Sequence, residues 1–299
     1  MAAWAPQPPA ARAAMFTRIS ASRPPDQPLS AFASGASAHT LLSPPAIQHA
    51  LLSLLSTPAA LPLRATCKEA RAAVAGHAWR DRDTVIRGSI AAWRRCFPRA
   101  QCANAGEGGW MSARPEHRRT PVVDADLAHL QGLLELSLVS CAGVTDAGFA
   151  HLRGIHTLDM RFCKGVTDAA LVHLAGIHTL DMSGCSTITG AGFEHLRGIH
   201  TLKINHCDGI TDAAFVHLAG IHTLDMSRCW AITDAAFAHL AGIHTLRVVG
   251  CVDIPGAALV HLHGTHTLDM ACCASKGFGF LRLRGISSLA LSSWSPPAH

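Results

Sequence analysis

The stretch GIHTLDMRFCKGVTDAALVHLA, residues 154–175, decides the fold, because the sequence repeats it in both directions at a constant length. Residues 176–185 read GIHTLDMSGC, and residues 220–229 read GIHTLDMSRC. A threonine recurs every 22 residues (167 − 145 = 22), at Thr145, Thr167, Thr189, Thr211 and Thr233. A glycine and a cysteine recur at the same step. A period of this length predicts a protein built from stacked copies of one structural unit.

Each unit combines a strand with a helix. Leu158 and Met160 alternate with polar residues, which predicts a strand. Thr145 and Asp146 are suited to the start of a helix, and Gly154 is suited to its end. One unit buries only about six apolar side chains, so it cannot offset the entropy lost in ordering its backbone. Stacked units can, and we expect strands centred near Leu136, Leu158, Leu180, Leu202, Leu224, Leu246 and Leu268.

The predicted fold class is therefore α/β, a solenoid with a curved parallel β-sheet and helices on its convex side. An eighth strand is expected near Leu289, one residue early, because Gly285 stands one residue before the position that the period gives. Trp294, Pro296 and Pro297 then indicate a C-terminal cap. The expected division is a disordered Ala/Pro-rich tail (1–40), a small helical domain (41–83), a linker with a degenerate first repeat (84–120), the repeats (121–294) and a short tail (295–299).

The order L-x-x-L-x-L-x-x-C, followed by [IV]-T-D-x-x-[FL]-x-x-L, resembles the cysteine-containing leucine-rich repeats of F-box proteins over residues 124–291. Residues 44–80 resemble the F-box itself. The residues that match its pattern are Pro44, Ile47, Leu51, Leu52, Ser53, Leu55, Leu63, Cys67, Lys68, Trp79 and Arg80.

This resemblance implies a substrate receptor of an SCF-type ubiquitin ligase. A three-helix F-box would bind the adaptor and, through it, the cullin, while the solenoid would hold an unknown target protein. The implied adaptor-binding residues are Pro44, Ile47, Leu51, Leu52, Leu55, Leu63, Cys67 and Trp79. Partner enzymes would transfer the ubiquitin, so no catalytic residue and no cofactor are expected. The alternative is a leucine-rich-repeat scaffold without any ligase, in which residues 41–82 merely cap the solenoid.

The repeated cysteines and histidines could suggest metal or catalytic chemistry. Thiols about 4.8 Å apart in a ladder do not converge on a tetrahedral zinc ion, so we expect structural cysteines and no metal. His156, Asp159 and Cys163 recur together in unit after unit, whereas an active site needs one unique arrangement. Two histidine columns, one of which begins at His151 and the other at His156, are expected on the surface, where they could also bind nickel, zinc or copper adventitiously. Neighbouring imidazoles should resist simultaneous protonation, which lowers their pKa.

The candidate target-binding residues are those that depart from the repeat on the expected concave face. Arginine, tryptophan and phenylalanine are frequent interface anchors, and basic residues favour an acidic or phosphorylated segment. The alternative is sequence drift between duplicated units. The candidates are Arg161, Phe162, Lys203, Asn205, His206, Arg228, Trp230 and Arg247.

Composition narrows the partners and the location. The formal net charge of +5 over 299 residues, without a long basic block, does not favour nucleic-acid binding. The eleven cysteines are odd in number and mostly evenly spaced, which favours reduced thiols and an intracellular protein, cytoplasmic or nuclear. We expect no membrane span. Arg12, Arg18 and Arg23 leave an organelle transit peptide as an alternative to a disordered tail.

Overall fold

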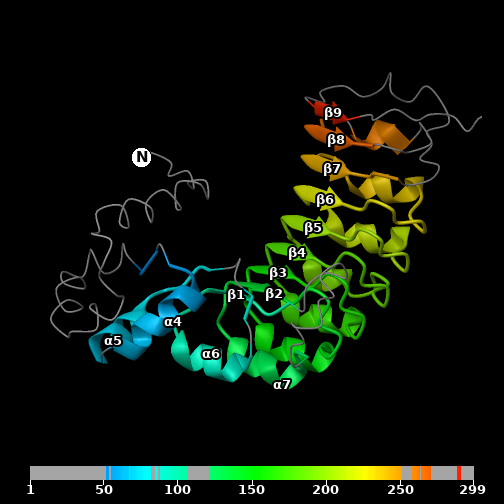
Figure 1. Ribbon diagram of the computed structural model, residues 1–299. Helices are drawn as coiled ribbons and strands as arrows, with labels where there is room; N and C mark the ends of the chain where they lie inside the picture. The colour runs from blue at the N-terminus through cyan, green and yellow to red at the C-terminus, as the bar shows by residue number, and fades with distance from the viewer. Residues whose placement is uncertain are drawn as a thin grey trace, which may run out of the picture.

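The computed structural model describes residues 52–53, 55–66, 68–81, 85–86, 88–106, 121–250, 258–262, 264–270 and 288–290. Its centre is one nine-stranded parallel sheet in which the strand order follows the chain. Figure 1 shows the strands stacked along the inner side of an arc, with the helical turns outside. The expectations for residues 1–40 and 295–299, and for Trp294, Pro296 and Pro297, lie outside the described residues.

The strands are short and the helical elements follow them regularly. The strands are β1 (Cys102–Asn104), β2 (Glu135–Ser137), β3 (Thr157–Asp159), β4 (Thr179–Asp181), β5 (Thr201–Lys203), β6 (Thr223–Asp225), β7 (Thr245–Arg247), β8 (Thr267–Asp269) and β9 (Ser288–Ala290). The helices are α4 (Thr57–Thr66), α5 (Lys68–Gly76), α6 (Ile90–Cys96) and α7 (Asp124–Leu127). The 3₁₀ turns are η3 (Ala128–Leu130), η4 (Asp146–Leu152), η5 (Asp168–Leu174), η6 (Phe193–Leu196), η7 (Asp212–Leu218), η8 (Asp234–His239) and η9 (Ala258–Leu262).

The register of the sheet confirms the strands expected from the repeat. Leu158 pairs with Leu180, and the same constant step holds from β2 to β8. The shortened last step is also present, because Leu268 pairs with Leu289. At the other end, Ala103 of β1 pairs with Leu136, a step of one and a half periods. The repeat of the sequence therefore does not reveal β1.

The helical half of the coils differs from the expectation in its form and, at Thr145, in its cap, whereas Thr167 and Thr233 do cap their own turns. From η4 onward, the helical elements described on the outer side are 3₁₀ turns rather than α-helices. A 3₁₀ turn rises about 2.0 Å per residue instead of about 1.5 Å, so the same number of residues covers more of the path back to the next strand. The Thr145 side chain does not cap its own turn. It donates to Asp124 of the preceding coil, at 2.6 Å between Oγ1 and Oδ2.

This contact between coils recurs, and we call it the Asp–Thr staple. In each staple, an aspartate accepts hydrogen bonds from both the backbone N–H and the hydroxyl of the threonine one coil later. Asp146 holds Thr167 in this way, at 2.7 and 2.6 Å. Gly190 stands where Thr211 would find its aspartate, so this staple cannot form. The staples in the described chain are Asp124–Thr145, Asp146–Thr167, Asp168–Thr189 and Asp212–Thr233.

Each coil contributes one layer to a continuous core. In the coil of β3, Leu158, Met160, Cys163 and Val166 are almost fully buried, and equivalent residues repeat this in the neighbouring coils. Gly154 has φ +80°, and the equivalent glycines of other coils are also left-handed, so a residue with a side chain would be strained there. The periodic apolar residues therefore face inward and leave the polar residues of the strands on the concave face.

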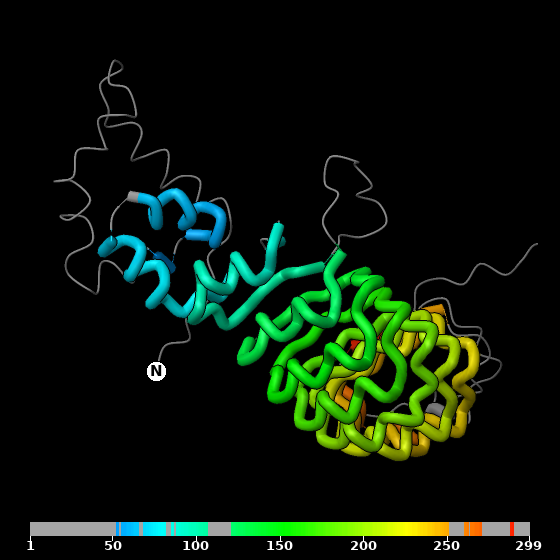
Figure 2. Tube along the Cα trace, turned by 90° about the horizontal axis from the view of Figure 1, so that it is seen from below, coloured from blue at the N-terminus to red at the C-terminus, as the bar shows by residue number. Residues whose placement is uncertain are grey.

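The helical N-terminal segment shares this core. Trp79 is 1 % exposed, and its ring contacts Phe97 edge-on at 5.3 Å between centroids. The Trp79 carbonyl accepts a hydrogen bond of 2.7 Å from the Gln101 backbone N–H, just before β1. Figure 2 shows this segment at one end of the arc, beyond the first coil. The segment thus covers the open end of the solenoid.

Candidate functional site

The concave face carries a ladder of alternating charges. Arg161 forms an ion pair with Asp159 at 2.8 Å and lies 3.7 Å from Asp181, which also contacts Lys203 at 3.7 Å. The hydrogen bond to Asp159 raises the pKa of Arg161. Further along the sheet, Arg247 bridges Asp225 and Asp269 at 3.4 and 3.3 Å.

Four of the predicted target-binding residues take part in this ladder. Arg161, Lys203 and Arg247 were expected to face a partner, but each is already held by carboxylates of its own sheet. Asn205 donates to Asp225 at 3.2 Å, so it belongs to the same network. The other four predicted target-binding residues, which lie outside this network, are Phe162, His206, Arg228 and Trp230.

Three of these residues share a strained backbone position immediately before the cysteine column. Phe162, His206 and Arg228 have φ of 60°, 58° and 57°. Gly184 and Gly250 occupy the same position in other coils, at φ 74° and 70°. A residue with a side chain costs on the order of 1–2 kcal/mol in this left-handed conformation. Strain of this kind is often retained where a side chain serves binding.

The side chains of this column lean along the sheet. A Cβ added to Gly184 would lie 2.4 Å from the Phe162 ring, and one added to Gly250 would lie 3.2 Å from Cγ of Arg228. Both side chains therefore lie over a neighbouring glycine. Nη1 of Arg228 is 3.4 Å from Nε2 of His206. We define the recognition strip as Phe162, Gly184, His206, Arg228 and Gly250, together with Trp230.

Trp230 is the most exposed large apolar residue of the described chain. Its side chain is 57 % exposed, and Phe162 is 45 % exposed. Trp230 follows Cys229, whose own side chain is buried. The strip therefore offers two exposed aromatic rings with an imidazole and a guanidinium between them.

The histidine column that begins at His156 forms a ladder of stacked rings. The ring centroids of successive members are 4.3–4.6 Å apart. Each Nδ1 lies 3.1–3.2 Å from Oγ1 of the following threonine. Partial desolvation, followed by the charge of neighbouring imidazoles, lowers the pKa of His178 and of His222, as the sequence predicted. In the described part of the chain, no three His, Cys, Asp or Glu side chains come together as a metal site.

The histidine ladder should make stability depend on pH. The folded-state pKa values of His178 and His222 lie below the unfolded value near 6.5, so below about pH 6.5 the unfolded chain binds more protons. Stability is then fully present above about pH 6.5 and falls on acidification. We expect a lower melting temperature at about pH 5.5 than at about pH 7.5, measured by scanning calorimetry.

The double substitution His178→Gln and His222→Gln provides the control, because it removes the two affected imidazoles and should weaken the pH dependence. Carboxylates contribute to the pH dependence of stability only at a lower pH, because their pKa values lie well below those of the imidazoles. For Asp168, desolvation is outweighed by hydrogen bonds from Thr189, Gly192 and Gly190, which lower its pKa. A melting temperature that is equal at both pH values would contradict the prediction.

The cysteine column has a structural role in the described coils. Cys185 donates from Sγ to the Met160 carbonyl of the preceding coil at 3.2 Å, and Cys207 does the same to Met182. Burial raises the pKa of Cys185, and it raises the pKa of Cys207 to about 11. These thiols are therefore protonated and bridge the coils. Cys251 and Cys273 lie outside the described residues.

The F-box-like segment is only partly described. Pro44, Ile47, Leu51 and Cys67 lie outside the described residues. Leu52 and Trp79 lie in the core and are 2 % and 1 % exposed. Leu55 and Leu63 are half-buried and pack against the core. Leu61 of α4, which is not among the residues that match the F-box pattern, is 46 % exposed.

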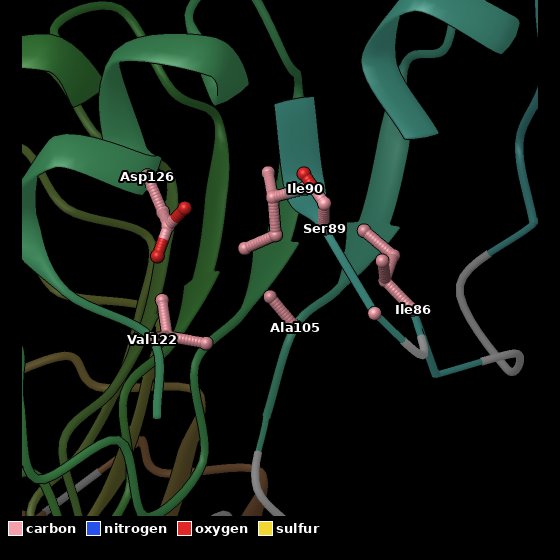
Figure 3. Close-up of a pocket in the computed structure, with 7 residues that line it drawn as sticks. Ile86, Ser89, Ile90, Ala105, Val122 and Asp126 are labelled. Carbon is pink, nitrogen blue, oxygen red and sulfur yellow. The ribbon is translucent and has the colours of Figure 1, made fainter. Parts of the chain in front are cut away.

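A small pocket lies where α6 and α7 meet the first strand. Figure 3 shows Asp126 above Val122 on one side of the pocket, with Ile90 and Ile86 across from them. Asp126 already accepts a hydrogen bond of 3.1 Å from the Val123 backbone N–H, which fixes the start of α7. The carboxylate is thus part of a helix cap.

Comparison with solved structures identifies the fold. The structure of a TLR13–ssRNA13 complex matches 80 % of this chain with a TM-score of 0.56 and 14 % identity. This chain spans about a third of that protein, 34 %. The yeast Rad7–Elc1 complex (17 % identity, TM-score 0.37) covers 44 % of this chain, and this chain covers 40 % of the matched one. Internalin C2 of Listeria monocytogenes, with 18 % identity and a TM-score of 0.38, matches 57 % of this chain and 84 % of its own chain.

No protein-family model matches the chain, and no curated protein matches it in sequence. No helix in the described residues is long and apolar enough to cross a membrane. The parallel sheet with one strand per coil, its helical turns on the outer side and its similarity to TLR13 together show that this chain has the leucine-rich-repeat fold.

Proposed function

We propose that this protein is a non-catalytic recognition subunit that binds a partner protein on the concave side of its solenoid. The observation that carries the proposal is the recognition strip, where Phe162, His206 and Arg228 occupy a backbone position that suits glycine. Ser140, Gly184 and Gly250 hold the same left-handed position in other coils, so the turn itself does not require a large side chain there. Exposed aromatic residues and arginine are also the side chains that contribute most to protein interfaces.

We further propose that the N-terminal helices bind the adaptor of an SCF-type ubiquitin ligase, which would make the bound partner a ubiquitination target. The resemblance of residues 44–80 to an F-box supports this role. Leu61 supports it as well, because an exposed leucine on α4 is available to an apolar groove of an adaptor. The subunit would act by raising the local concentration of the target at the ligase. Such a role is compatible with the cytoplasm or the nucleus.

The test is capture of a purified SCF adaptor by the full chain. Leu61→Asp should abolish capture, because a carboxylate would be buried without a partner in an apolar interface. Leu134→Asp is a matched control, since Leu134 is equally exposed, at 46 %, but lies on the solenoid. Both variants should keep the wild-type melting temperature. If the intact chain does not capture the adaptor, the scaffold alternative replaces the ligase role.

A further inference from the structure

Arg228 differs from the other arginines and lysines of the concave side. Arg161, Lys203 and Arg247 are each within 4 Å of a carboxylate. For Arg228, the described residues provide no such carboxylate, and its guanidinium contacts only the imidazole of His206. It also lies in the strained column and is exposed. Among the described residues, therefore, no carboxylate neutralises this guanidinium in the recognition strip.

We propose that Arg228, oriented by His206, binds one carboxylate of an acidic peptide segment in the partner, while Phe162 receives an apolar side chain of the same segment. The proposal rests on the concave-side recognition proposed above and names the chemistry of its ligand. A guanidinium can hold both oxygens of a carboxylate in parallel hydrogen bonds. Nε2 of His206 accepts from Nη1 of Arg228 at 3.4 Å and thereby orients the guanidinium.

The charge of the site favours a carboxylate over a phosphate group. The strip contains one permanent positive charge, and a phosphate carries close to two negative charges at neutral pH. Phosphate sites in proteins usually combine several basic side chains. The neighbouring Lys203 and Arg247 are held by Asp181 and Asp225 and contribute little net positive charge. One carboxylate therefore matches the strip.

The geometry of the sheet also sets the spacing within the segment. Phe162 and Arg228 occupy the same position of two coils that are three steps apart, with Gly184 and His206 between them. Adjacent parallel strands are about 4.8 Å apart, so the two sites are roughly 14 Å apart. An extended chain advances about 3.4 Å per residue, so about four residues separate the apolar side chain from the acidic one. Trp230 lies just beyond Arg228 and can cover an apolar residue next to the carboxylate.

Synthetic peptides test this directly with the full chain. The peptides carry one leucine and one aspartate at a series of separations, from adjacent to well beyond the expected spacing, and each is also made with asparagine or phosphoserine in place of the aspartate. We expect the tightest binding, measured by fluorescence anisotropy, at a separation of about four residues. The asparagine and phosphoserine peptides should bind at least about tenfold more weakly.

Matched substitutions separate the strip from the rest of the face. Arg228→Gln should weaken binding of the aspartate peptide at least about tenfold and leave the asparagine peptide unaffected. Arg247→Gln removes an exposed arginine that is already paired and should change binding less than about threefold. Trp230→Ala should weaken both peptides.

The inference is overturned if no peptide binds the folded chain, if asparagine or phosphoserine binds as well as aspartate, or if Arg228→Gln behaves like Arg247→Gln. Failure of this inference can be distinguished from failure of the proposed adaptor binding, because adaptor capture and its loss in Leu61→Asp do not depend on the strip. A chain that captures the adaptor but ignores the acidic peptides would keep the ligase role and lose this ligand.

Discussion

Replacing Trp79 by alanine is expected to lower the free energy of unfolding by about 3–5 kcal/mol. The indole is fully buried, contacts Phe97 and His77, and donates from Nε1 to the Val74 carbonyl at 2.8 Å. Its loss would leave a large cavity where the N-terminal helices meet the first coil. Because the solenoid and these helices form one hydrophobic cluster, the whole chain should melt at a lower temperature.

Thermal unfolding followed by circular dichroism measures this effect. Trp230→Ala is the matched control, since it removes the same side chain from an exposed site and should change stability by less than about 1 kcal/mol. If both variants melt at the same temperature, the N-terminal helices do not stabilise the solenoid.

Deleting residues 176–197 is expected to give a folded solenoid that is one coil shorter. The deletion removes β4 and η6, and it joins Ala175 to Gly198 in place of Gly176, so every column stays in register. Leu158 would then pair with Leu202 instead of Leu180. Stability should fall only by the contribution of one coil and its contact with a neighbour, because each coil of a solenoid touches only adjacent coils.

Deleting residues 176–186 is the contrasting variant, because half a coil would place strand residues next to helical residues. Apolar side chains would then face solvent, and the segments before and after the deletion could not share one core. We expect loss of cooperative unfolding and rapid limited proteolysis. If the half-coil variant melts as sharply as the full-coil variant, the register does not control folding.

Much of the fold could be predicted because one short-range pattern recurs. The alternation at Leu158 and Met160 gives the strand, and the constant step gives the parallel register. The first strand could not be predicted in this way, since the step from Ala103 to Leu136 exceeds one period and Ala103 lacks the leucine of later strands. The 3₁₀ form of the turns was also missed, because it depends on how far the chain must travel back to the sheet.

The candidate site could be predicted only in part. Deviations from the repeat correctly marked Phe162 and Trp230 as exposed, but they did not reveal that Arg247 is neutralised. The sequence does contain a signal for the pairing of Arg247. Residues one period apart are neighbours in a parallel sheet, and Asp225, Arg247 and Asp269 alternate in charge. The strained column had a signal too, because Gly184 occupies the position of Phe162 one coil later. Both signals become visible only once the pairing register of the strands is known.

The missing staple at Gly190 has a mechanical consequence. Elsewhere from Asp124 to Thr233 each described coil is tied to the next by an aspartate and a threonine, but Thr211 has no carboxylate to hold it. Gly190 has φ +90°, and an added Cβ would lie 2.5 Å from Cβ of Ala214, so an aspartate would not fit there without rearrangement. Under a force that pulls the two ends apart, the coils between Asp124 and Thr233 would therefore separate first at this junction, as two blocks.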